Sequence, residues 1–422
     1  MGRTLVEKIL HAHTDADAIV PGDVVMLRCD VVMTNDISGP MAFRAMERMG
    51  ATRVFDPEKV VIVPDHFVPA KDERSAALQK LLRDWALDQG VAYYEQGRGG
   101  IEHQVLVEEG WVLPGSVIAG GDSHTCTYGA LGSFGTGLGS TDIGACLASG
   151  SFWQVVPTTV QIELTGTRQP FVTGKDVILA VIREIGVAGG LGSVLEFVGS
   201  GAEELSLDER LAVANMAVEA GAETGLFPAD EAVASYLDGR TERPWTAERT
   251  DPDVEIERVV PIDLEGIPPL VALPHSPGNV VPVSEARGRR IDQVYIGNCA
   301  NGTITDLRQA AEMLRGRTVH SRTRLIVVPA SQRVMRQALA EGLIDVFVAS
   351  GALVSAPTCG ACFGGSGGIL AAGETALTTT NRNFRGRMGA GESSVHLANA
   401  WVAAAAAVAG EIVDPSDLGV AP

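Results

Sequence analysis

The sequence has little positive charge and no long apolar run, and both shortages narrow the classes of protein to consider. It contains 33 Lys and Arg against 52 Asp and Glu, a formal net charge of −19. This balance argues against broad binding to nucleic acids or anionic membranes, although a local group of arginines can still bind an anionic substrate. No apolar run reaches the ~18 residues of a membrane-spanning helix, and the polar N-terminus does not match a signal peptide.

Cysteines and aromatic residues are also few. Six cysteines in 422 residues do not suggest a disulfide framework, so we expect a cytoplasmic protein with reduced thiols. Aromatic residues make up 5% of the chain, whereas 49 glycines favour tight turns between packed helices and strands. An apolar content of 45% supports a large core, and the length predicts about three domains.

Polar and sulfur-containing residues follow segments that have the pattern of buried strands. The clearest cases are residues 60–63 before Asp65 and His66, residues 117–119 before Asp122, Ser123 and His124, and residues 293–296 before Cys299. Amphipathic helices are predicted over 78–85, with Leu78, Leu81, Leu82 and Trp85 on the apolar face and a stop at Gly90, and over 307–314. In open α/β sheets, ligands bind beyond the carboxyl ends of the strands. The sequence therefore predicts an α/β fold with a binding site at these strand ends.

The middle of the chain contains a helix signal with two polar residues on one face. Ser206 and Glu209 form a capping-box pattern, which predicts a helix running to about Ala220. Asn215 and Glu219 have the i, i+4 spacing that puts both side chains on the same face of that helix.

Two less regular stretches suggest where the chain divides. Residues 238–254 are charged and lack periodicity, as in a surface connection, and residues 268–282 carry several prolines, as in a linker. We therefore expect three α/β domains, over 1–157, 158–284 and 285–422.

Three cysteines are candidates for a metal centre. Cys299 lies in a Gly-rich segment after a predicted strand, and Cys359 and Cys362 form a Cys-x-x-Cys pair further on. Three converging thiolates can hold an iron–sulfur cluster in which one iron lacks a protein ligand and acts as a Lewis acid. A Cys-x-x-Cys pair also occurs in zinc sites, in redox sites and without any role. By contrast, Cys29 and Cys146 have apolar neighbours in sequence and are expected to be buried residues without a chemical role.

Three of the eight histidines follow a carboxylate residue closely. The pairs are Asp65 with His66, Glu102 with His103, and Asp122 with His124. A carboxylate partner fixes the tautomer of a histidine and raises its basicity, as general acid–base catalysis requires. Taken singly, each pair could equally be a capped turn with a satisfied histidine.

A short loop near the C-terminus concentrates arginines. Arg382, Arg385 and Arg387 lie within seven residues that also contain glycine. Guanidinium groups bind carboxylates in a bidentate manner, so the loop is a candidate anion site. The alternative is a solvated basic turn.

Together, these segments resemble the aconitase superfamily, and within it the group that contains the large subunits of isopropylmalate dehydratases and homoaconitases. The motifs that carry the resemblance are Pro64-Asp-His66, Gly121-Asp-Ser-His-Thr125, Asn215-Met-x-x-Glu219, Ile296-Gly-Asn-Cys-Ala-Asn-Gly302, Pro357-Thr-Cys-Gly-Ala-Cys362 and Asn381-Arg-Asn-Phe-x-Gly-Arg387. They occur in the order of the family and span nearly the whole chain.

The resemblance implies three α/β/α domains around a central cleft and a [4Fe–4S] cluster held by Cys299, Cys359 and Cys362. It implies catalytic roles for Asp65, His66, His103, Asp122, Ser123, His124 and Glu219. It further implies substrate binding by Ser123, Arg382 and Arg387, and contacts to the cofactor from Asn215, Asn301 and Asn381.

The implied reaction is the reversible loss and addition of water on a hydroxylated di- or tricarboxylic acid. Within this group the expected substrate is 3-isopropylmalate, exchanged with 2-isopropylmalate in leucine biosynthesis. The swivel domain of the family would follow the last motif, yet the sequence ends at Pro422. We therefore expect a separate small subunit that carries this domain, and we expect no nucleic-acid or membrane partner.

Several positions depart from the usual pattern of the family. The residues beside the first cluster cysteine are Asn298 and Ala300, Ser366 follows the Cys-x-x-Cys glycines, and Arg385 replaces a common acidic residue. Changes next to the ligands tune a metal centre without removing it. They leave open a paralogue that acts on homoaconitate, methylmalate, dimethylmalate or another substituted malate. An RNA-binding apo-protein and a zinc or redox protein are further alternatives.

Overall fold

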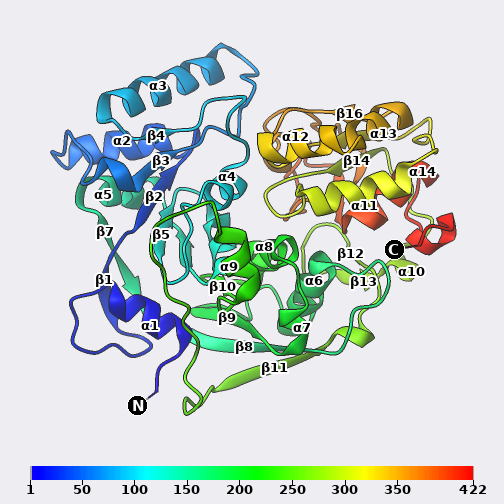
Figure 1. Cartoon of the computed structure of the whole chain (residues 1–422). Helices are drawn as coiled ribbons and strands as arrows, with labels where there is room; N and C mark the ends of the chain where they lie inside the picture. Colours follow the sequence, from blue (N-terminus) through cyan, green and yellow to red (C-terminus); the bar gives the residue numbers. More distant parts are fainter. Residues whose placement is uncertain (1, 422) are drawn as a thin grey trace.

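Three large β-sheets, each built from its own stretch of the chain, organise the molecule (Figure 1). The computed structural model describes residues 2–421. Within them, a five-stranded parallel sheet lies between residues 31 and 137, and a four-stranded parallel sheet lies between 158 and 263. A seven-stranded mixed sheet lies between residues 270 and 397. The α/β fold class predicted from the sequence is confirmed.

The five-stranded sheet has the order β4-β3-β2-β5-β6, and helices cover both of its faces. Its strands are β2 (Val31–Thr34), β3 (Val60–Ile62), β4 (Ala92–Tyr93), β5 (Val117–Gly120) and β6 (Phe134–Gly137). Val32 and Val60 pack with helices α2 and α5, whereas Met33 and Val61 point to the opposite face, where α4 lies. Burial on both faces explains why these strands are almost continuously apolar.

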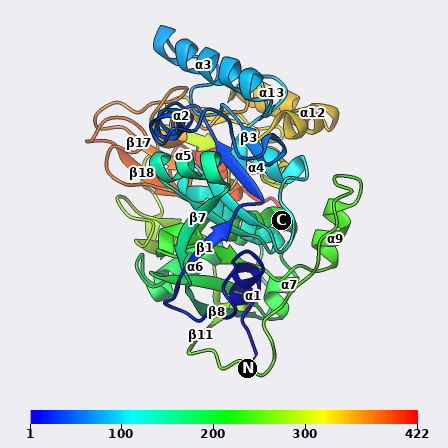
Figure 2. The same cartoon turned by 90° about the vertical axis from the view of Figure 1, so that its left-hand side faces the viewer.

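The other elements of this N-terminal part surround the sheet. They are α1 (Leu5–Ala12), α2 (Gly39–Arg48), α3 (Glu73–Gln89), α4 (Glu102–Glu108), α5 (Ser140–Ser149) and the 3₁₀ helices η1 (Pro57–Lys59) and η2 (Ser123–Leu131). A two-stranded antiparallel ribbon pairs β1 (Val24–Arg28) with β7 (Ser151–Val155), and Figure 2 shows it from the side on which α2 and α5 lie.

Helix α3 forms where the sequence predicted it and ends at Gly90, which adopts a left-handed conformation with φ 73°. Its buried face differs from the predicted one at Leu81. Leu82 is fully buried, but Leu81 is 39% exposed. Trp85 stacks on Phe43 of α2 with ring centroids 3.8 Å apart. Trp85 therefore packs against α2, whereas the side chain of Leu81 faces solvent.

The four-stranded sheet has the order β10-β9-β8-β11. Its elements are β8 (Thr158–Thr165), α6 (Gly174–Ile185), β9 (Ser193–Val198), α7 (Ser200–Glu203), α8 (Leu207–Asn215), η3 (Met216–Ala220), β10 (Gly225–Leu226), α9 (Glu231–Leu237) and β11 (Arg258–Asp263). The capping box of Ser206 is confirmed, but the α-helix ends at Asn215 and continues to Ala220 as a 3₁₀ turn. Residues 238–254 contain no helix or strand beyond a turn at their start.

The seven-stranded sheet has the order β13-β12-β18-β17-β14-β15-β16. Its strands are β12 (Leu270–Ala272), β13 (Val280–Pro282), β14 (Gln293–Ile296), β15 (Arg324–Val327), β16 (Leu353–Val354), β17 (Thr375–Thr378) and β18 (Ser394–Leu397). The remaining elements from β11 onward are η4 (Leu264–Gly266), α10 (Val283–Ala286), α11 (Ile304–Leu314), α12 (Gln332–Ala340), α13 (Leu343–Ser350), η5 (Gly360–Phe363), α14 (Ala400–Ala409) and η6 (Pro415–Leu418).

The stretch 268–282 was expected to be a linker, and this expectation is wrong. It forms β12 and β13, which pair antiparallel, and β12 continues the sheet by pairing with β18. Pro282 is tolerated because β13 is an edge strand, and the other prolines of the stretch lie before β12 or in the connection between β12 and β13. The prolines therefore mark a sheet edge and not a flexible connection.

In the five-stranded and the seven-stranded sheet, the carboxyl ends of the parallel strands face a common region. Residues after β2, β3 and β5 approach it from one side, and residues after β14, β16 and β17 approach it from the other. None of the helices within residues 2–421 has the length and apolar character needed to cross a lipid bilayer.

Candidate active site

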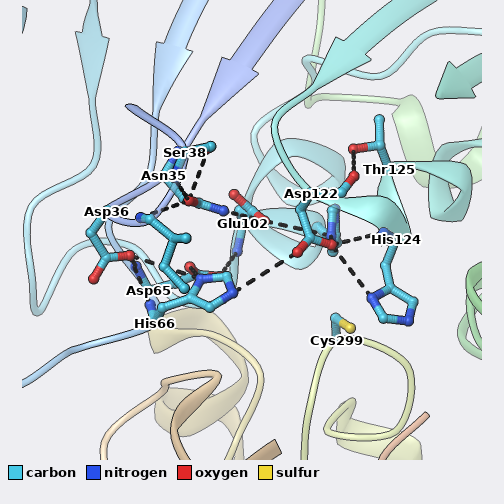
Figure 3. A network of polar contacts seen from close by, with 12 residues as sticks. Asn35, Asp36, Ser38, Asp65, His66, Glu102, Asp122, His124, Thr125 and Cys299 are labelled. Atoms are coloured by element: carbon cyan, nitrogen blue, oxygen red, sulfur yellow. Dashed lines mark hydrogen bonds and ion pairs between the residues drawn. The ribbon is translucent and has the colours of Figure 1, made fainter. Parts of the chain in front are cut away.

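A small cavity lies between the N-terminal and C-terminal sheets. Its walls combine carboxylates, imidazoles, thiols and one guanidinium, all from loops or helix starts next to strand ends. The lining residues are Asp65, His66, Ile101, Glu102, His103, Asp122, His124, Cys299, Cys359, Cys362 and Arg387. The prediction that polar residues after the strands would meet is thus confirmed, and Figure 3 shows how they face one another.

His66 is held by the carboxylate next to it in sequence. Its Nδ1 atom lies 2.6 Å from Asp65 Oδ1, and the ring is 6% exposed. Burial lowers the pKa of His66, but the charge and hydrogen bond of Asp65 outweigh burial and raise it to about 9. The ring edge also packs against Phe363 at 4.8 Å between centroids. His66 is therefore a protonated group at neutral pH, with its Nε2 atom 3.9 Å from Asp122.

Asp36 fixes the backbone of the His66 segment (Figure 3). Its carboxylate accepts the backbone N–H groups of Asp65, His66 and Phe67 at 3.2, 3.0 and 2.8 Å. Burial raises the pKa of Asp36, and the neighbouring Asp65 charge raises it further. No signal in the sequence singled out Asp36, because its function depends on backbone donors from a different loop.

Asp122 links two of the predicted histidines. His103 Nε2 lies 3.0 Å from Asp122 Oδ1, and the same oxygen accepts the backbone N–H of His124 at 2.7 Å. Burial raises the pKa of Asp122, but hydrogen bonds from His103 and His124 outweigh it, so the pKa falls well below its usual value. Asp122 is therefore an anion. His103 pairs with this aspartate and not with its sequence neighbour Glu102, whose oxygen is 3.6 Å away.

His124 connects the cavity to Glu219 and Arg382. Its Nε2 atom lies 3.2 Å from Glu219 Oε1, which also accepts a hydrogen bond from Arg382 Nε at 2.6 Å. Burial lowers the pKa of His124, yet hydrogen bonds to Asp122 and Glu219 raise it overall. Burial likewise opposes ionisation of Glu219, but His124 and Arg382 lower its pKa. The chain of charges alternates in sign, which stabilises all three groups.

The pKa of the Glu102 carboxyl group is shifted in the direction opposite to that of Asp122. Glu102 is 1% exposed and accepts a hydrogen bond from Asn35 Nδ2 at 3.0 Å. Burial, followed by the charges of Asp65 and Asp122, raises the pKa of Glu102 well above its usual value. Burial therefore favours the neutral form of Glu102, whereas the surroundings of Asp122 favour its ionised form. Two nearby carboxyl groups with opposite pKa shifts are typical of sites that move protons.

The three predicted cysteines converge on the cavity from two loops. Cys299 and Cys362 are 6% and 2% exposed, and Cys359 is half-buried. Burial raises the pKa of Cys299, whereas a hydrogen bond from Cys359 lowers the pKa of Cys362 to about 5. Soft sulfur donors gathered in a dry pocket are the ligand set of iron–sulfur clusters.

Amide groups surround the first of these sulfur atoms. Asn215 Nδ2 and Asn381 Nδ2 each donate to Cys299 Sγ at 3.2 Å, and Asn381 also donates to Asn215 Oδ1 at 2.5 Å. Asn298 in turn binds Asn381 Oδ1 through its side chain. Two donors aimed at one sulfur favour a thiolate, the form that binds a metal. This geometry fits a cluster ligand.

Backbone constraints set the positions of the sulfur loops. Gly297 has φ 135°, and a Cβ atom there would lie 2.1 Å from the Val328 carbonyl oxygen, so only glycine permits the turn into Cys299. In the other loop, the N–H of Cys359 and the hydroxyl of Thr358 both donate to the Asp65 carbonyl oxygen at 2.8 Å. The second sulfur loop is thereby tied to the His66 segment.

Four predicted residues remain: Arg387 lines the cavity, whereas Ser123, Arg382 and Asn301 do not. The Arg382 guanidinium binds Glu219, whereas Arg385 is exposed and Arg387 lines the cavity with a buried Nε atom that has no partner within residues 2–421. Ser123 starts η2 and is half-buried. The side-chain amide of Asn301 donates to Asp306 at 3.1 Å and not to a sulfur atom. The predicted roles of Ser123, Arg382, Arg387 and Asn301 stay predictions.

Comparison with known proteins gives a consistent picture. The model of the aconitase family (aconitate hydratase) matches residues 7–290 and 285–410. A protein of Rubrobacter xylanophilus named 3-isopropylmalate dehydratase large subunit 2 is 70% identical over 418 residues, which cover 99% of each chain. The 3-isopropylmalate dehydratase large subunit of Desulfitobacterium hafniense is 50% identical over 420 residues, covering 99% of this chain and 100% of the relative.

A solved structure shares the fold. The holo-form of aconitase X from Thermococcus kodakaraensis superimposes with a TM-score of 0.50 and covers 89% of each chain, at 13% sequence identity. This likeness concerns the fold alone, whereas the family model and the full-length relatives extend over the loops that build the cavity. The resemblance seen in the sequence is thus confirmed, and the chain belongs to the aconitase family.

Proposed function

We propose that this chain is the cluster-bearing large subunit of a 3-isopropylmalate dehydratase, a hydro-lyase that exchanges 2- and 3-isopropylmalate. One observation carries the proposal. Cys299 from one loop and Cys359 and Cys362 from another line the same cavity as His66, His103 and His124. The relatives with this name match the chain from end to end at 50–70% identity.

The donor set is suited to a [4Fe–4S] cluster. Three thiols in a buried pocket, with two amides donating to Cys299, leave room for one iron without a protein ligand. Such an iron supplies Lewis-acid chemistry toward a hydroxyl and a carboxylate of the substrate. Zinc also binds Cys and His ligands, so the content of inorganic sulfide distinguishes a cluster from a zinc site.

The histidine wall has the groups that a dehydration needs. His66, with its pKa raised by Asp65 to about 9 against the effect of burial, carries a proton at neutral pH and can protonate a departing hydroxyl. Asp122 stays ionised between His103 and His124, so it keeps both rings oriented. Burial raises the pKa of Glu102, which favours the protonated carboxyl, a form that donates a hydrogen bond without adding negative charge to the pocket.

We propose that two arginines bind the carboxylates of the substrate. Arg387 lines the cavity, and its buried Nε atom lacks a partner, so a carboxylate oxygen would complete its hydrogen bonding. Arg382 uses Nε to bind Glu219, which leaves the outer nitrogens of its guanidinium for a second carboxylate. We assign Arg387 the direct contact with a substrate carboxylate, and we assign Arg382 a position next to Arg387.

A small subunit is part of the proposal. The relatives are named large subunits, which implies a smaller partner in those enzymes. We propose that this chain pairs with such a subunit, that the partner carries the swivel domain, and that it completes the substrate pocket. Because the sulfur atoms must stay reduced for cluster assembly, we assign the enzyme to the cytoplasm.

A paralogue with another substituted malate is the second candidate. Asn298 next to Cys299 holds Asn381 with its side chain and also accepts the backbone N–H groups of Ala300 and Asn301. It therefore shapes the loop that carries the first sulfur, where this chain departs from the usual pattern. Homoaconitate, methylmalate and dimethylmalate are the substrates to compare with 3-isopropylmalate.

The test is anaerobic reconstitution of the chain with iron and sulfide, alone and with its small subunit. We expect a brown protein with inorganic sulfide, and hydration activity that is highest on the isopropylmalate pair. Replacing Cys299, Cys359 or Cys362 with Ser should remove the colour and the activity. The matched control is Cys29→Ala, a buried thiol in an apolar core, which should keep both. A colourless protein that stays active after chelation would refute the proposal.

A further inference from the structure

Tyr128 is a buried aromatic residue that the proposed mechanism does not use. It lies in η2, is 0% exposed, and its hydroxyl oxygen is 3.3 Å from Nδ1 of His103, which lines the cavity. The two rings meet edge to face with their centroids 5.6 Å apart. Within residues 2–421 the hydroxyl has no other hydrogen-bond partner. The contact joins segments that are 25 positions apart, so no local signal in the sequence indicated it.

The second ring nitrogen of His103 is engaged as well. Its Nε2 atom lies 3.0 Å from Asp122 Oδ1, an oxygen that also accepts the backbone N–H of His124 at 2.7 Å. Burial opposes ionisation of Asp122, but hydrogen bonds from His103 and His124 outweigh burial and hold the pKa of this carboxyl well below its usual value. An ionised carboxylate only accepts hydrogen bonds, so the proton in the contact with His103 belongs to Nε2.

The proton of the tyrosine hydroxyl determines the state of Nδ1. Burial raises the pKa of Tyr128 well above its usual value, so the hydroxyl keeps its proton. A buried O–H group needs an acceptor, and in the described part of the chain Nδ1 of His103 is the one it contacts. A proton on Nδ1 would place two donors face to face and leave the tyrosine proton without an acceptor, which is costly in a protein interior. Hydrogen-bond satisfaction therefore favours a neutral ring with its single proton on Nε2.

The other ionisable groups around His103 do not reach Nδ1. Glu102 Oε1 lies 3.6 Å from Nε2, and the His124 ring is 6.4 Å away between centroids. Negative groups favour a second proton on His103, whereas positive groups oppose it, so their effects partly cancel. Among residues 2–421, Tyr128 alone makes a hydrogen-bond contact with Nδ1. The remaining ionisable groups of the cavity wall are Asp65, His66, Arg387 and the three cysteines.

We propose that Tyr128 is a positioning residue that keeps His103 neutral, so that His103 is a fixed hydrogen-bond donor to Asp122 and not a proton donor to the substrate. This inference rests on the proposed function, because it divides the roles within the histidine wall. Both nitrogens of His103 are engaged by protein groups, which leaves the ring no free donor for a departing hydroxyl. The role of acid then stays with His66, and His103 holds the Asp122 carboxylate in one orientation.

The experiment is nuclear magnetic resonance of the full chain before cluster reconstitution, kept reduced and labelled with ¹⁵N-histidine. Long-range ¹H–¹⁵N correlation distinguishes the two neutral tautomers from the doubly protonated ring, and the signals of His103 are those missing from His103→Gln. At neutral pH we expect a protonated Nε2 and an unprotonated Nδ1. Tyr128→Phe removes the donor at Nδ1, so at a fixed pH the ratio of doubly protonated to neutral His103 should rise at least about threefold.

Tyr94 offers a matched control. Its hydroxyl accepts the Trp111 N–H at 2.8 Å, so Tyr94→Phe removes a tyrosine hydroxyl from a hydrogen bond without a histidine and should leave the His103 signals unchanged. A proton on Nδ1 in the wild type would overturn the inference, and this measurement needs no variant that folds. Equal ratios in Tyr128→Phe and the wild type would also overturn it. So would an equal rise in both tyrosine variants, because the effect would then be a general loosening of the core.

Kinetics of the reconstituted enzyme separate this inference from the proposed function. Tyr128→Phe should lower kcat about three- to tenfold and leave KM within about twofold, because the hydroxyl supports Asp122 without touching the substrate. A wild-type protein that takes up no iron and sulfide would refute the proposed function, whatever the spectrum of His103 shows. A loaded and active enzyme whose His103 carries two protons at neutral pH would refute only the assignment of Tyr128.

Discussion

The Nδ1 atom of His66 lies 2.6 Å from a carboxylate oxygen of Asp65, and both side chains are buried. This contact, opposed by burial, is the main reason why the pKa of His66 is raised to about 9. The pairing makes the protonated ring the dominant form at neutral pH, as an acid that donates to a leaving hydroxyl requires.

Asp65→Asn should therefore change the pH dependence of the reaction. Without the carboxylate charge, the pKa of His66 falls, so the ring loses its proton at a lower pH. We expect kcat/KM to drop about 100-fold and its basic limb to move toward lower pH. Asp30→Asn removes the partner of a different histidine, His13, and should leave the profile unchanged. An unshifted basic limb in Asp65→Asn would exclude His66 as the acid.

The amides that donate to Cys299 should govern how firmly iron is held. Asn215→Ala and Asn381→Ala each remove one 3.2 Å hydrogen bond to the sulfur. Loss of such support to a ligand typically costs 10- to 100-fold in metal affinity, so we expect about that increase in the rate of iron loss to a chelator.

Asn383 provides the control for this comparison. Asn383 lies in the same loop as Asn381, but its amide donates to the Leu273 carbonyl oxygen at 2.8 Å and not to sulfur. Asn383→Ala should lower thermal stability without speeding iron release. Equal release from all three variants would mean that the loop as a whole, and not the contact to sulfur, holds the iron.

The crossing of α2 and α5 should tolerate no side chain at Gly144. A Cβ atom there would lie 2.6 Å from Ala45 Cβ and 2.7 Å from the Ala42 carbonyl oxygen. Gly144→Ala must push the helices apart, and we expect a loss of about 1–3 kcal/mol in the free energy of unfolding, measured with urea. Gly391→Ala meets no atom within 4 Å and should unfold like the wild type.

The pair His13–Asp30 predicts how stability varies with pH. Burial lowers the pKa of His13, but the hydrogen bond and charge of Asp30 outweigh burial and raise it. Burial raises the pKa of Asp30, but the hydrogen bond and charge of His13 outweigh burial and lower it. The histidine contribution is complete below its unfolded pKa of 6.5 and is lost as pH rises through the folded value. The aspartate contribution is complete above 3.8 and is lost as pH falls through the folded value.

The melting temperature of the wild type should therefore exceed that of Asp30→Asn most between pH 3.8 and 6.5. Since the Asp30 side chain is 36% exposed, solvent screens the pair and its contribution should stay below ~1 kcal/mol. A difference that grows above pH 8 would contradict this assignment.

Much of the site could be predicted because the relevant signals are local. The apolar runs before Asp65, Asp122 and Cys299 marked strand ends, and the carboxyl ends of parallel strands meet at one edge. The capping pattern of Ser206 located the start of α8 in the same way, and the expectation that Cys29 and Cys146 are buried is confirmed. Such signals need only neighbours in sequence.

The missed features depend on contacts between distant segments. Asp36 matters because three backbone N–H groups of another loop donate hydrogen bonds to its carboxylate. The prolines of 268–282 were taken for a linker because an edge strand accepts them as readily as a loop does. The face of α3 was misjudged because stacking of Trp85 on Phe43 outweighed the burial of Leu81.

A single carbonyl group has a wider consequence. The Asp65 carbonyl oxygen receives both the N–H of Cys359 and the hydroxyl of Thr358, while the Asp65 side chain steers His66. A shift of the cysteine loop would therefore act on the residue that orients His66. In the proposed enzyme, damage to the metal centre would thus also disturb the proposed proton donor.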